Sequence, residues 1–238
     1  GGENMRSLLD RAKEAGLTTG LDMVKPDPAS AAGRVDWRAW MRRVLPAVDL
    51  FLPSLEEILL MLDRKKYPWA EQGLDPGRVD GKLLGQVSDE LIAMGCAVVA
   101  LKLGNQGLYL RSTEKGGRLV AARLAHPGKT QSWEGRELYA PCYQVQVRGT
   151  RAAGDSTNAG ILAGLAKGLD PRYIVRMGVA VGASSVESLE GPGALPPWPE
   201  IEERVQKGWK QHSSLLQLSQ FRRNEQLGIR TGPQDRDA

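Results

Sequence analysis

Residue types that build disulfide frameworks and metal centres are scarce in this chain of 238 residues. It contains two cysteines, Cys96 and Cys142, and two histidines, His126 and His212. Two cysteines cannot make a disulfide framework, and two histidines cannot make a multi-histidine metal site. We therefore expect both thiols to be small buried groups in a reducing compartment, and both histidines to be surface residues.

Long apolar runs are also missing, and aromatic residues make up only 5% of the chain. No segment approaches the roughly 20 apolar residues that a membrane-spanning helix needs. Residues 1–4 lack the basic and apolar regions of a signal peptide. The net charge of +4 comes from Lys and Arg scattered among acids, without interleaved aromatics. These observations predict a cytoplasmic protein that binds neither membranes nor nucleic acid.

What the chain does contain is a repeated alternation of helix and strand patterns. Helical spacing over residues 37–45, 54–62 and 79–94 is interrupted by short apolar strands at 48–52 and 97–101. This order predicts an α/β fold of three layers, with a mainly parallel central sheet flanked by helices. Ligands of such sheets bind beyond the carboxyl ends of the strands, where Asp22 and the segment 54–57 fall.

The most informative segment is the turn of small residues at 149–156 and the helix that follows it. Residues 143–147 alternate apolar and polar positions and predict a strand before the turn. The first N–H groups of a helix have no partners within it and attract anions such as phosphate. Asp155 would repel an anion there unless it removes a proton from an alcohol attacking a phosphoryl group. The simpler alternative is that Asp155 caps the helix.

Residues 152–155, Ala-Ala-Gly-Asp, resemble the second signature of the ribokinase-like (PfkB) carbohydrate kinases, Gly-Ala-Gly-Asp. The resemblance implies that Asp155 is the catalytic base. It also implies that the backbone of Ala152, Ala153 and Gly154 forms an anion hole for the transferring phosphate. Ala152 stands where the family has glycine. Gly149 stands where many members carry an Asp that helps to bind a monovalent cation, so we do not predict that cation site.

Two further segments resemble the family in the expected order. Residues 50–57 are similar to the strand-to-helix segment whose Asn-x-x-Glu motif lies near magnesium and phosphate. Ser54 replaces the Asn, and the resemblance implies that Glu57 helps to hold Mg²⁺ through water. Ser54 and Glu57 also fit a capping box, and the two interpretations are compatible.

The third similar segment, residues 98–110, resembles the nucleotide-side hairpin of the family. This likeness implies that Lys102, Gly104 and Gly107 contact the nucleotide, although a plain hairpin turn has the same pattern. The helix predicted over 171–186 is rich in small residues, which favours close helix packing. The family places this helix beside the nucleotide base, and so the resemblance adds Val179, Gly182 and Ala183 as lining residues.

The resemblance extends over residues 1–209, which would be the C-terminal, nucleotide-binding and catalytic part of a kinase domain. The family's N-terminal half, which carries the substrate residues and the lid, has no counterpart here. Such a chain would be either a truncated or processed kinase, or a half whose exposed hydrophobic sheet edge is covered by a homodimer or a partner chain. Residues 210–238 show little periodicity and predict a mobile tail. Residues 123–135 predict an exposed excursion in which Trp133 is partly covered.

The resemblance therefore implies a carbohydrate kinase that uses ATP and Mg²⁺. It would transfer the γ-phosphoryl group to a hydroxyl of a sugar or sugar-like substrate. The alternative is a non-catalytic nucleotide- or ligand-binding module derived from the same fold. A nicotinamide-dependent dehydrogenase is disfavoured, because no Gly-x-Gly-x-x-Gly follows the first strand.

Overall fold

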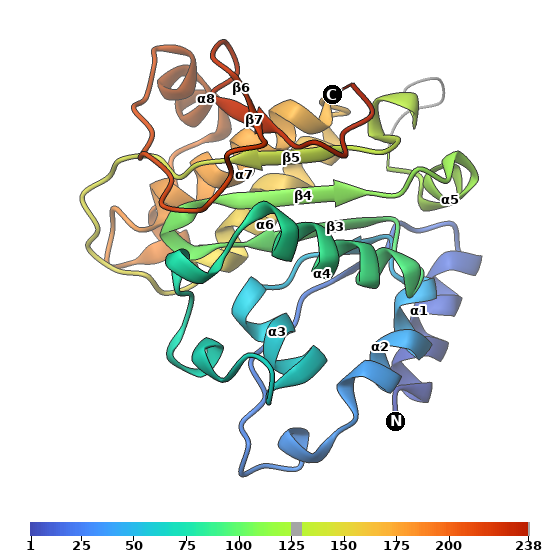
Figure 1. Cartoon of the computed structure of the whole chain (residues 1–238). Helices are drawn as coiled ribbons and strands as arrows, with labels where there is room; N and C mark the ends of the chain where they lie inside the picture. The colour runs from blue at the N-terminus through green and yellow to red at the C-terminus, as the bar shows by residue number, and fades with distance from the viewer. Residues whose placement is uncertain (125–129, 238) are drawn as a thin grey trace.

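The computed structural model of the chain describes residues 1–124 and 130–237. Its centre is one sheet, in the spatial order β1-β2-β3-β4-β5-β7-β6 (Figure 1). The strands are β1 (Gly20–Leu21), β2 (Leu50–Phe51), β3 (Val98–Lys102), β4 (Leu108–Ser112), β5 (Glu137–Ala140), β6 (Arg222–Asn224) and β7 (Ile229–Thr231). The expected parallel pairing holds from β1 to β3, and every pairing from β3 to β6 is antiparallel.

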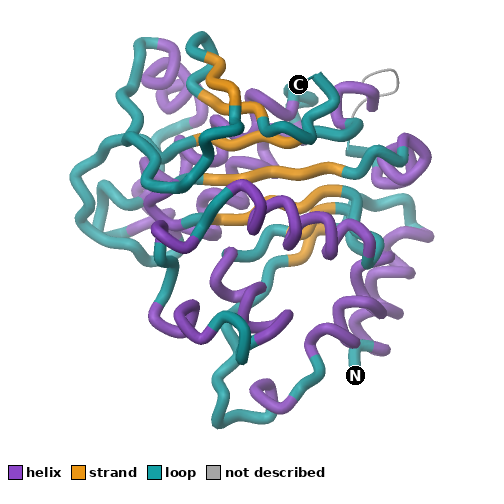
Figure 2. The backbone as a smooth tube through the Cα atoms, in the orientation of Figure 1, coloured by secondary structure: helices purple, strands orange, loops and turns teal. Residues whose placement is uncertain are grey.

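Helices cover both faces of this sheet (Figure 2). They are α1 (Glu3–Glu14), α2 (Trp37–Val44), α3 (Leu55–Asp63), α4 (Gly81–Ala93), α5 (Gly116–Ala122), α6 (Ala153–Ala166), α7 (Pro171–Ser185) and α8 (Trp198–Gln206). Neighbouring strand residues belong to different cores, because Phe51 packs with the α1–α4 side and Leu50 packs with the α6–α8 side. The predicted three-layer α/β class is therefore confirmed. In the described part of the chain, no helix has the length and apolar character to cross a membrane.

The strand predicted over residues 143–147 does not form. The strand lies earlier in the chain, as β5, and pairs with β4. Tyr143 makes only an isolated bridge with Gln211, and its ring stacks on Trp209 with the ring centroids 4.5 Å apart. The indole Nε1 of Trp209 donates to the carbonyl of Gln144 at 2.9 Å. The alternation in this loop therefore reflects its packing against the segment after α8.

The predicted mobile tail is also wrong as a description of residues 210–237. This segment packs across the sheet and supplies β6 and β7, which extend the sheet beyond β5. Leu216, Leu218 and Phe221 are buried, and the Phe221 ring lies 6.4 Å from the ring of Tyr109. Trp133, expected to be partly covered, is fully buried. The predicted surface position of His126 lies outside the described residues.

Small residues allow α6 and α7 to pack closely. A Cβ added to Gly160 would lie 2.9 Å from the Cα of Gly178, a distance that side chains do not tolerate. A Cβ added to Gly182 would lie 2.2 Å from Oγ1 of Thr157. The predicted packing role of the small residues in α7 is therefore confirmed. This close packing fixes the start of α6 against the second half of α7.

A buried ionic network lies at the amino end of β2. The carboxylate of Asp49, which is fully buried, accepts from Lys13 Nζ and from Arg118 Nη1, both at 2.7 Å. It also accepts from the backbone N–H of Thr19 at 2.8 Å. The network joins α1 and α5 to the residues that precede β1 and β2. It therefore lies at the amino ends of the parallel strands, opposite their carboxyl ends.

Candidate active site

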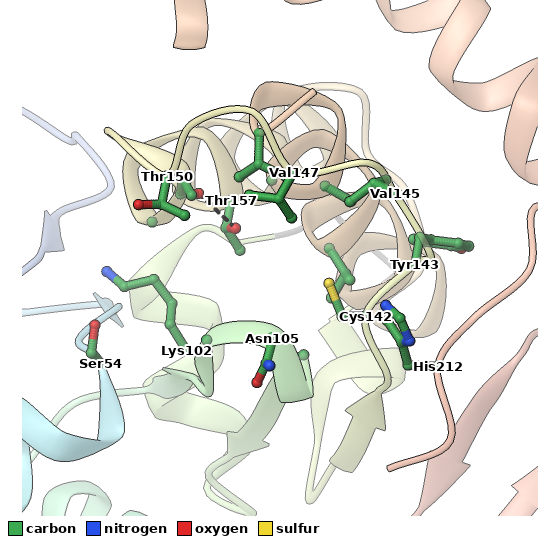
Figure 3. Close-up of a pocket in the computed structure, with 18 of the residues that line it drawn as sticks. Ser54, Lys102, Asn105, Cys142, Tyr143, Val145, Val147, Thr150, Thr157 and His212 are labelled. Carbon is green, nitrogen blue, oxygen red and sulfur yellow. Dashed lines mark hydrogen bonds between the residues drawn. The ribbon is translucent and has the colours of Figure 1, made fainter. Parts of the chain in front are cut away.

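A cavity of about 330 Å³ lies at the carboxyl ends of the parallel strands, between the β3–β4 turn and the facing ends of α6 and α7 (Figure 3). It is lined by residues from several elements: Ser54, Glu56, Lys102, Gly104, Asn105, Gly107, Cys142, Tyr143, Val145, Val147, Thr150, Ala153, Gly154, Thr157, Val179, Gly182, Ala183, Val186 and His212. Nine of these were predicted from the sequence: Ser54, Lys102, Gly104, Gly107, Ala153, Gly154, Val179, Gly182 and Ala183. The predicted residues Ala152, Asp155 and Glu57 are not part of this lining.

The β3–β4 turn follows from its glycines. The turn passes through η5 (Gly104–Gln106), a single 3-10 turn, and Gly107 then adopts a φ of 110°. A Cβ at Gly107 would lie 2.0 Å from the carbonyl oxygen of Ala140. Only glycine fits this position, because a side chain would collide with β5. The turn therefore presents backbone, and few side-chain atoms, to the cavity.

The start of α6 has the free donors of an anion site. Within the described residues, the N–H groups of Gly154 and Asp155 have no hydrogen-bond acceptor, whereas Ser156 N–H bonds to the carbonyl of Ala152 at 2.9 Å. Ala152, the N-cap, adopts a φ of 55° and a ψ of 21°. This left-handed conformation suits glycine and costs a non-glycine residue about 1–2 kcal/mol. Alanine in place of the family's glycine at position 152 therefore strains the turn.

Asp155 lies in the first turn of α6 and is exposed. Its two preceding residues line the cavity. The N-cap is Ala152, and no side chain caps this helix. The alternative in which Asp155 is merely the cap is thus not supported, since Asp155 sits three positions inside the helix.

The two adjacent glutamates of α3 have different roles. Glu57 Oε2 accepts from the backbone N–H of Ser54 at 3.0 Å, which completes the predicted capping box. Glu56 instead lines the cavity, and its Oε2 is buried with no hydrogen-bond partner in the described structure. Burial raises the pKa of the Glu56 carboxyl above its ordinary value of 4.5, and Lys102 partly opposes this effect. Nothing in the sequence pattern indicates that Glu56 faces the cavity.

A polar cluster joins the strand ends to α6. Lys102 Nζ donates to Oδ2 of Asp22 and to the carbonyl of Leu52, both at 2.6 Å. The same Asp22 oxygen accepts from Asn158 Nδ2 at 2.7 Å. A Cβ added to Gly154 would lie 3.4 Å from Cε of Lys102, so the lysine stem packs against the start of α6. The ammonium of Lys102, paired with Asp22, therefore lies beside the start of α6 and its free donors.

Comparison with known proteins decides the family. A model of the pfkB family carbohydrate kinases matches residues 2–197. The chain belongs to this family. It is 28% identical over 156 residues to an uncharacterized sugar kinase of Archaeoglobus fulgidus, covering 66% of this chain and 47% of the relative. It is also 28% identical over 127 residues to a 2-dehydro-3-deoxygluconokinase of Bacillus subtilis, covering 51% of this chain and 33% of the relative.

Solved structures of ribokinases share the fold. A ribokinase of Arabidopsis thaliana, complexed with ribose and ATP, has a TM-score of 0.59 at 16% identity, covering 87% of this chain and 53% of that one. A ribokinase of Thermotoga maritima has a TM-score of 0.54 at 21% identity, covering 84% of this chain and 52% of that one. These likenesses show a ribokinase-like fold. The chain spans about half the length of these structures and less than half of the two relatives above.

In this pfkB chain, the cavity has two chemically different ends. Figure 3 shows Ser54, Lys102 and Thr150 at one end and Cys142, Tyr143 and His212 at the other. Cys142 is half-buried, and burial raises the pKa of its thiol. Cys96 is buried as predicted, which raises its pKa to about 12. His212 is exposed as predicted, yet it also lines the cavity, a position that depends on the packed segment after α8.

The residues present fit a magnesium ion that is shared with a phosphate ligand. Among the described residues, no three His, Cys, Asp or Glu side chains gather into a metal-binding group. Mg²⁺ is commonly held by one or two carboxylates together with substrate phosphates and water. The unpartnered oxygen of Glu56 in the cavity wall is a suitable single ligand. Glu57 meets this requirement less well, since its carboxylate completes the capping box.

Proposed function

We propose that this chain carries the nucleotide-binding and catalytic part of a kinase that transfers the γ-phosphoryl group of ATP to a hydroxyl of a sugar-like substrate. The observation that carries the proposal is the start of α6, where Gly154, with a free N–H group, lines the cavity, and Asp155, with a second free N–H group and an exposed carboxylate, follows at once. Membership of the carbohydrate kinase family supports the reaction class. A neighbour of the same fold is described as complexed with ribose and ATP, which supports the choice of ligands.

The two ends of the cavity suggest how ATP lies. The free amides of Gly154 and Asp155 would donate to oxygens of the transferring phosphate, and the ammonium of Lys102 would lie nearby. The apolar part of the lining, Val145, Val179 and Ala183, suits a flat base. Phosphates at the α6 end and base at the His212 end would place the nucleotide along the length of the cavity.

Each residue at the α6 end then has a task in the transfer. Asp155 would accept the proton of the attacking hydroxyl, and its exposed position leaves room for the sugar to approach. The amides of Gly154 and Asp155 would stabilise charge on the phosphoryl oxygens, an effect worth on the order of 3 kcal/mol per donor in comparable sites. Glu56 would hold Mg²⁺, which when bound neutralises negative charge on the phosphates.

The test of this function is acceptor-dependent formation of ADP in the presence of Mg²⁺. Ribose and an acidic deoxy sugar such as 2-dehydro-3-deoxygluconate form the panel, since one neighbour of the same fold is described as complexed with ribose and one relative is named a 2-dehydro-3-deoxygluconokinase. We expect one acceptor to raise ADP formation well above the rate with ATP alone. Calorimetric binding of ATP without consumption of any acceptor would contradict the kinase and favour a non-catalytic nucleotide-binding module.

A Glu56→Gln variant is expected to require more Mg²⁺ and yet to be more stable. Losing the carboxylate should weaken the apparent Mg²⁺ affinity during turnover by roughly 10- to 100-fold. The raised pKa means that protonation of Glu56 stabilises the native state fully below pH 4.5, and this contribution is lost as pH rises through the higher native pKa. Above that native pKa the native state carries a desolvated charge that glutamine removes. We expect a melting temperature about 2 °C higher.

The matched control is Glu57→Gln, one residue further along α3. Glutamine also serves at this position of a capping box, so stability should change little. Mg²⁺ dependence should also stay near that of the wild type. A larger loss of Mg²⁺ affinity in Glu57→Gln than in Glu56→Gln would show that the metal ligand is the residue implied by the family resemblance, and would refute the assignment to Glu56.

A further inference from the structure

The segment after α8 builds a second cavity, of about 360 Å³, outside the part of the chain that the family model matches. Its floor is the β6–β7 hairpin, and its wall is the segment 210–214. The lining residues are Pro141, Lys210, Gln211, His212, Ser213, Ser214, Arg223, Gly228, Ile229 and Arg230. Except for Pro141, all of them lie beyond residue 197, where the family match ends. The cavity is therefore built mostly by residues outside the family match.

The lining of this second cavity is cationic. It contains Lys210, Arg223 and Arg230 and, among its described residues, no Asp or Glu. Arg223 and Arg230 are directly opposite each other in the β6–β7 pairing, which puts both side chains on one face of the hairpin. Like charges directly opposite each other destabilise a hairpin. Folding alone does not account for this arrangement.

Little inside the protein compensates these charges. Arg223 pairs with Glu225 at 3.1 Å, but both side chains are largely exposed, at 68% and 73%. Such exposed pairs contribute little. Lys210 and Arg230 have no ion-pair partner in residues 1–124 and 130–237. The cavity therefore keeps an excess of positive charge that an anion would neutralise.

We propose that this second cavity binds the phosphate group of a small phosphorylated molecule. Arginine guanidinium groups present paired donors that match phosphate oxygens, and two of them face each other here. The lysine ammonium and the Ser213 hydroxyl supply further donors on the wall. A cavity of about 360 Å³ falls in the size range of small-molecule sites. Three cations favour a dianionic phosphate over a single carboxylate.

The second cavity shares a wall with the first. His212 lines both cavities. Its backbone N–H donates to the carbonyl of Cys142 at 2.8 Å, and Gln144 N–H donates to the carbonyl of Lys210 at 2.8 Å. An anion that orders the segment 210–214 would therefore also order the base end of the first cavity and strengthen nucleotide binding. This coupling rests on the proposed function, whereas the anion site does not.

The experiment is calorimetric titration of the protein with inorganic phosphate at constant ionic strength. We expect binding to the wild type and about tenfold weaker binding to Arg230→Gln. The matched control is Arg222→Gln, on the same hairpin but paired with Thr231 on its other face and absent from the cavity lining. This control should bind phosphate within twofold of the wild type. Lys210→Gln, at an exposed position, gives a second variant that should also weaken binding if Arg230→Gln fails to fold.

Three results would overturn the anion site. They are no binding of phosphate at millimolar concentration, equal weakening in Arg230→Gln and Arg222→Gln, and binding that neither Arg230→Gln nor Lys210→Gln changes. The last result would assign the phosphate to the start of α6. The coupling is tested separately, since saturating phosphate should tighten the binding of a non-hydrolysable ATP analogue to the wild type but not to Arg230→Gln. If the analogue does not bind at all, the proposed function fails while the phosphate titration still decides the anion site.

Discussion

An Asp155→Asn variant is expected to lose sugar phosphorylation by about three orders of magnitude while it still binds ATP. Asparagine has the same shape as aspartate but cannot take up the proton of the attacking hydroxyl. The start of α6 should be unchanged, because no side chain caps this helix and the free donors belong to the backbone. Removing a negative charge beside those donors should leave ATP affinity equal or slightly improved. The measurements are kcat for acceptor-dependent ADP formation and Kd for ATP by calorimetry.

The control for this variant is Asp170→Asn, the same change at the start of the neighbouring helix. Asp170 caps α7 and pairs with Arg172 at 2.8 Å, and these contacts hold the pKa of its carboxyl below its usual range despite partial burial. Asparagine is also a good cap, so only a small loss of stability is expected. The residues of α7 that line the cavity lie in its other half, and kcat should not change. Near-normal turnover of Asp155→Asn would show that Asp155 is not the base.

Replacing Asp49 with alanine is expected to lower the free energy of unfolding by about 3–5 kcal/mol. The variant leaves Lys13 and Arg118, both at least three-quarters buried, without the carboxylate that both contact at 2.7 Å. It also leaves the buried N–H of Thr19 without its carboxylate acceptor. Removing one partner of a buried network costs more than the network contributes when complete, since the remaining groups stay desolvated. Urea unfolding should show a lower midpoint with an unchanged slope.

The matched control for the network is Asp10→Ala. Asp10 pairs with Arg6 at 2.8 Å on α1, but both side chains are more than a third exposed, at 42% and 37%. An exposed pair of this spacing contributes about 0.5 kcal/mol. If Asp10→Ala and Asp49→Ala cost similar amounts, the network at the amino end of β2 is not a major source of stability. The folded fraction of Asp49→Ala should bind ATP normally, because the network lies at the opposite edge of the sheet.

The parts of the molecule that local sequence signals specify were predictable. An aspartate cap followed by proline marks the start of the helix at residues 171–185. The β3–β4 turn requires glycine at position 107. Alternating helix and strand patterns placed the ends of the parallel strands together. Lys102, Gly154 and Gly182, which come from three different elements, therefore met in one cavity as predicted. The family resemblance supplied the order of these segments.

What was not predictable depends on contacts between distant residues. Residues 210–237 have few apolar side chains, and Leu216, Leu218 and Phe221 become buried only by packing on the face of the sheet that carries Tyr109. Tyr143 follows an alternating pattern, but stacking on Trp209 decides its conformation. Glu56 and Glu57 are adjacent acids on one helix, and the capping hydrogen bond to Ser54 determines which of them faces the cavity. Sequence spacing alone does not separate these two glutamates.

The β6–β7 hairpin has a practical consequence for anyone who shortens this polypeptide. Ending it at residue 197, where the family match stops, would strip β5 of its pairing partner β7, at Leu138 and Tyr139. It would also uncover Tyr109, against which Phe221 packs. A bare strand with unsatisfied backbone groups beside exposed aromatic surface is a template for another copy. We expect such a fragment to self-associate and precipitate, however well its nucleotide cavity is preserved.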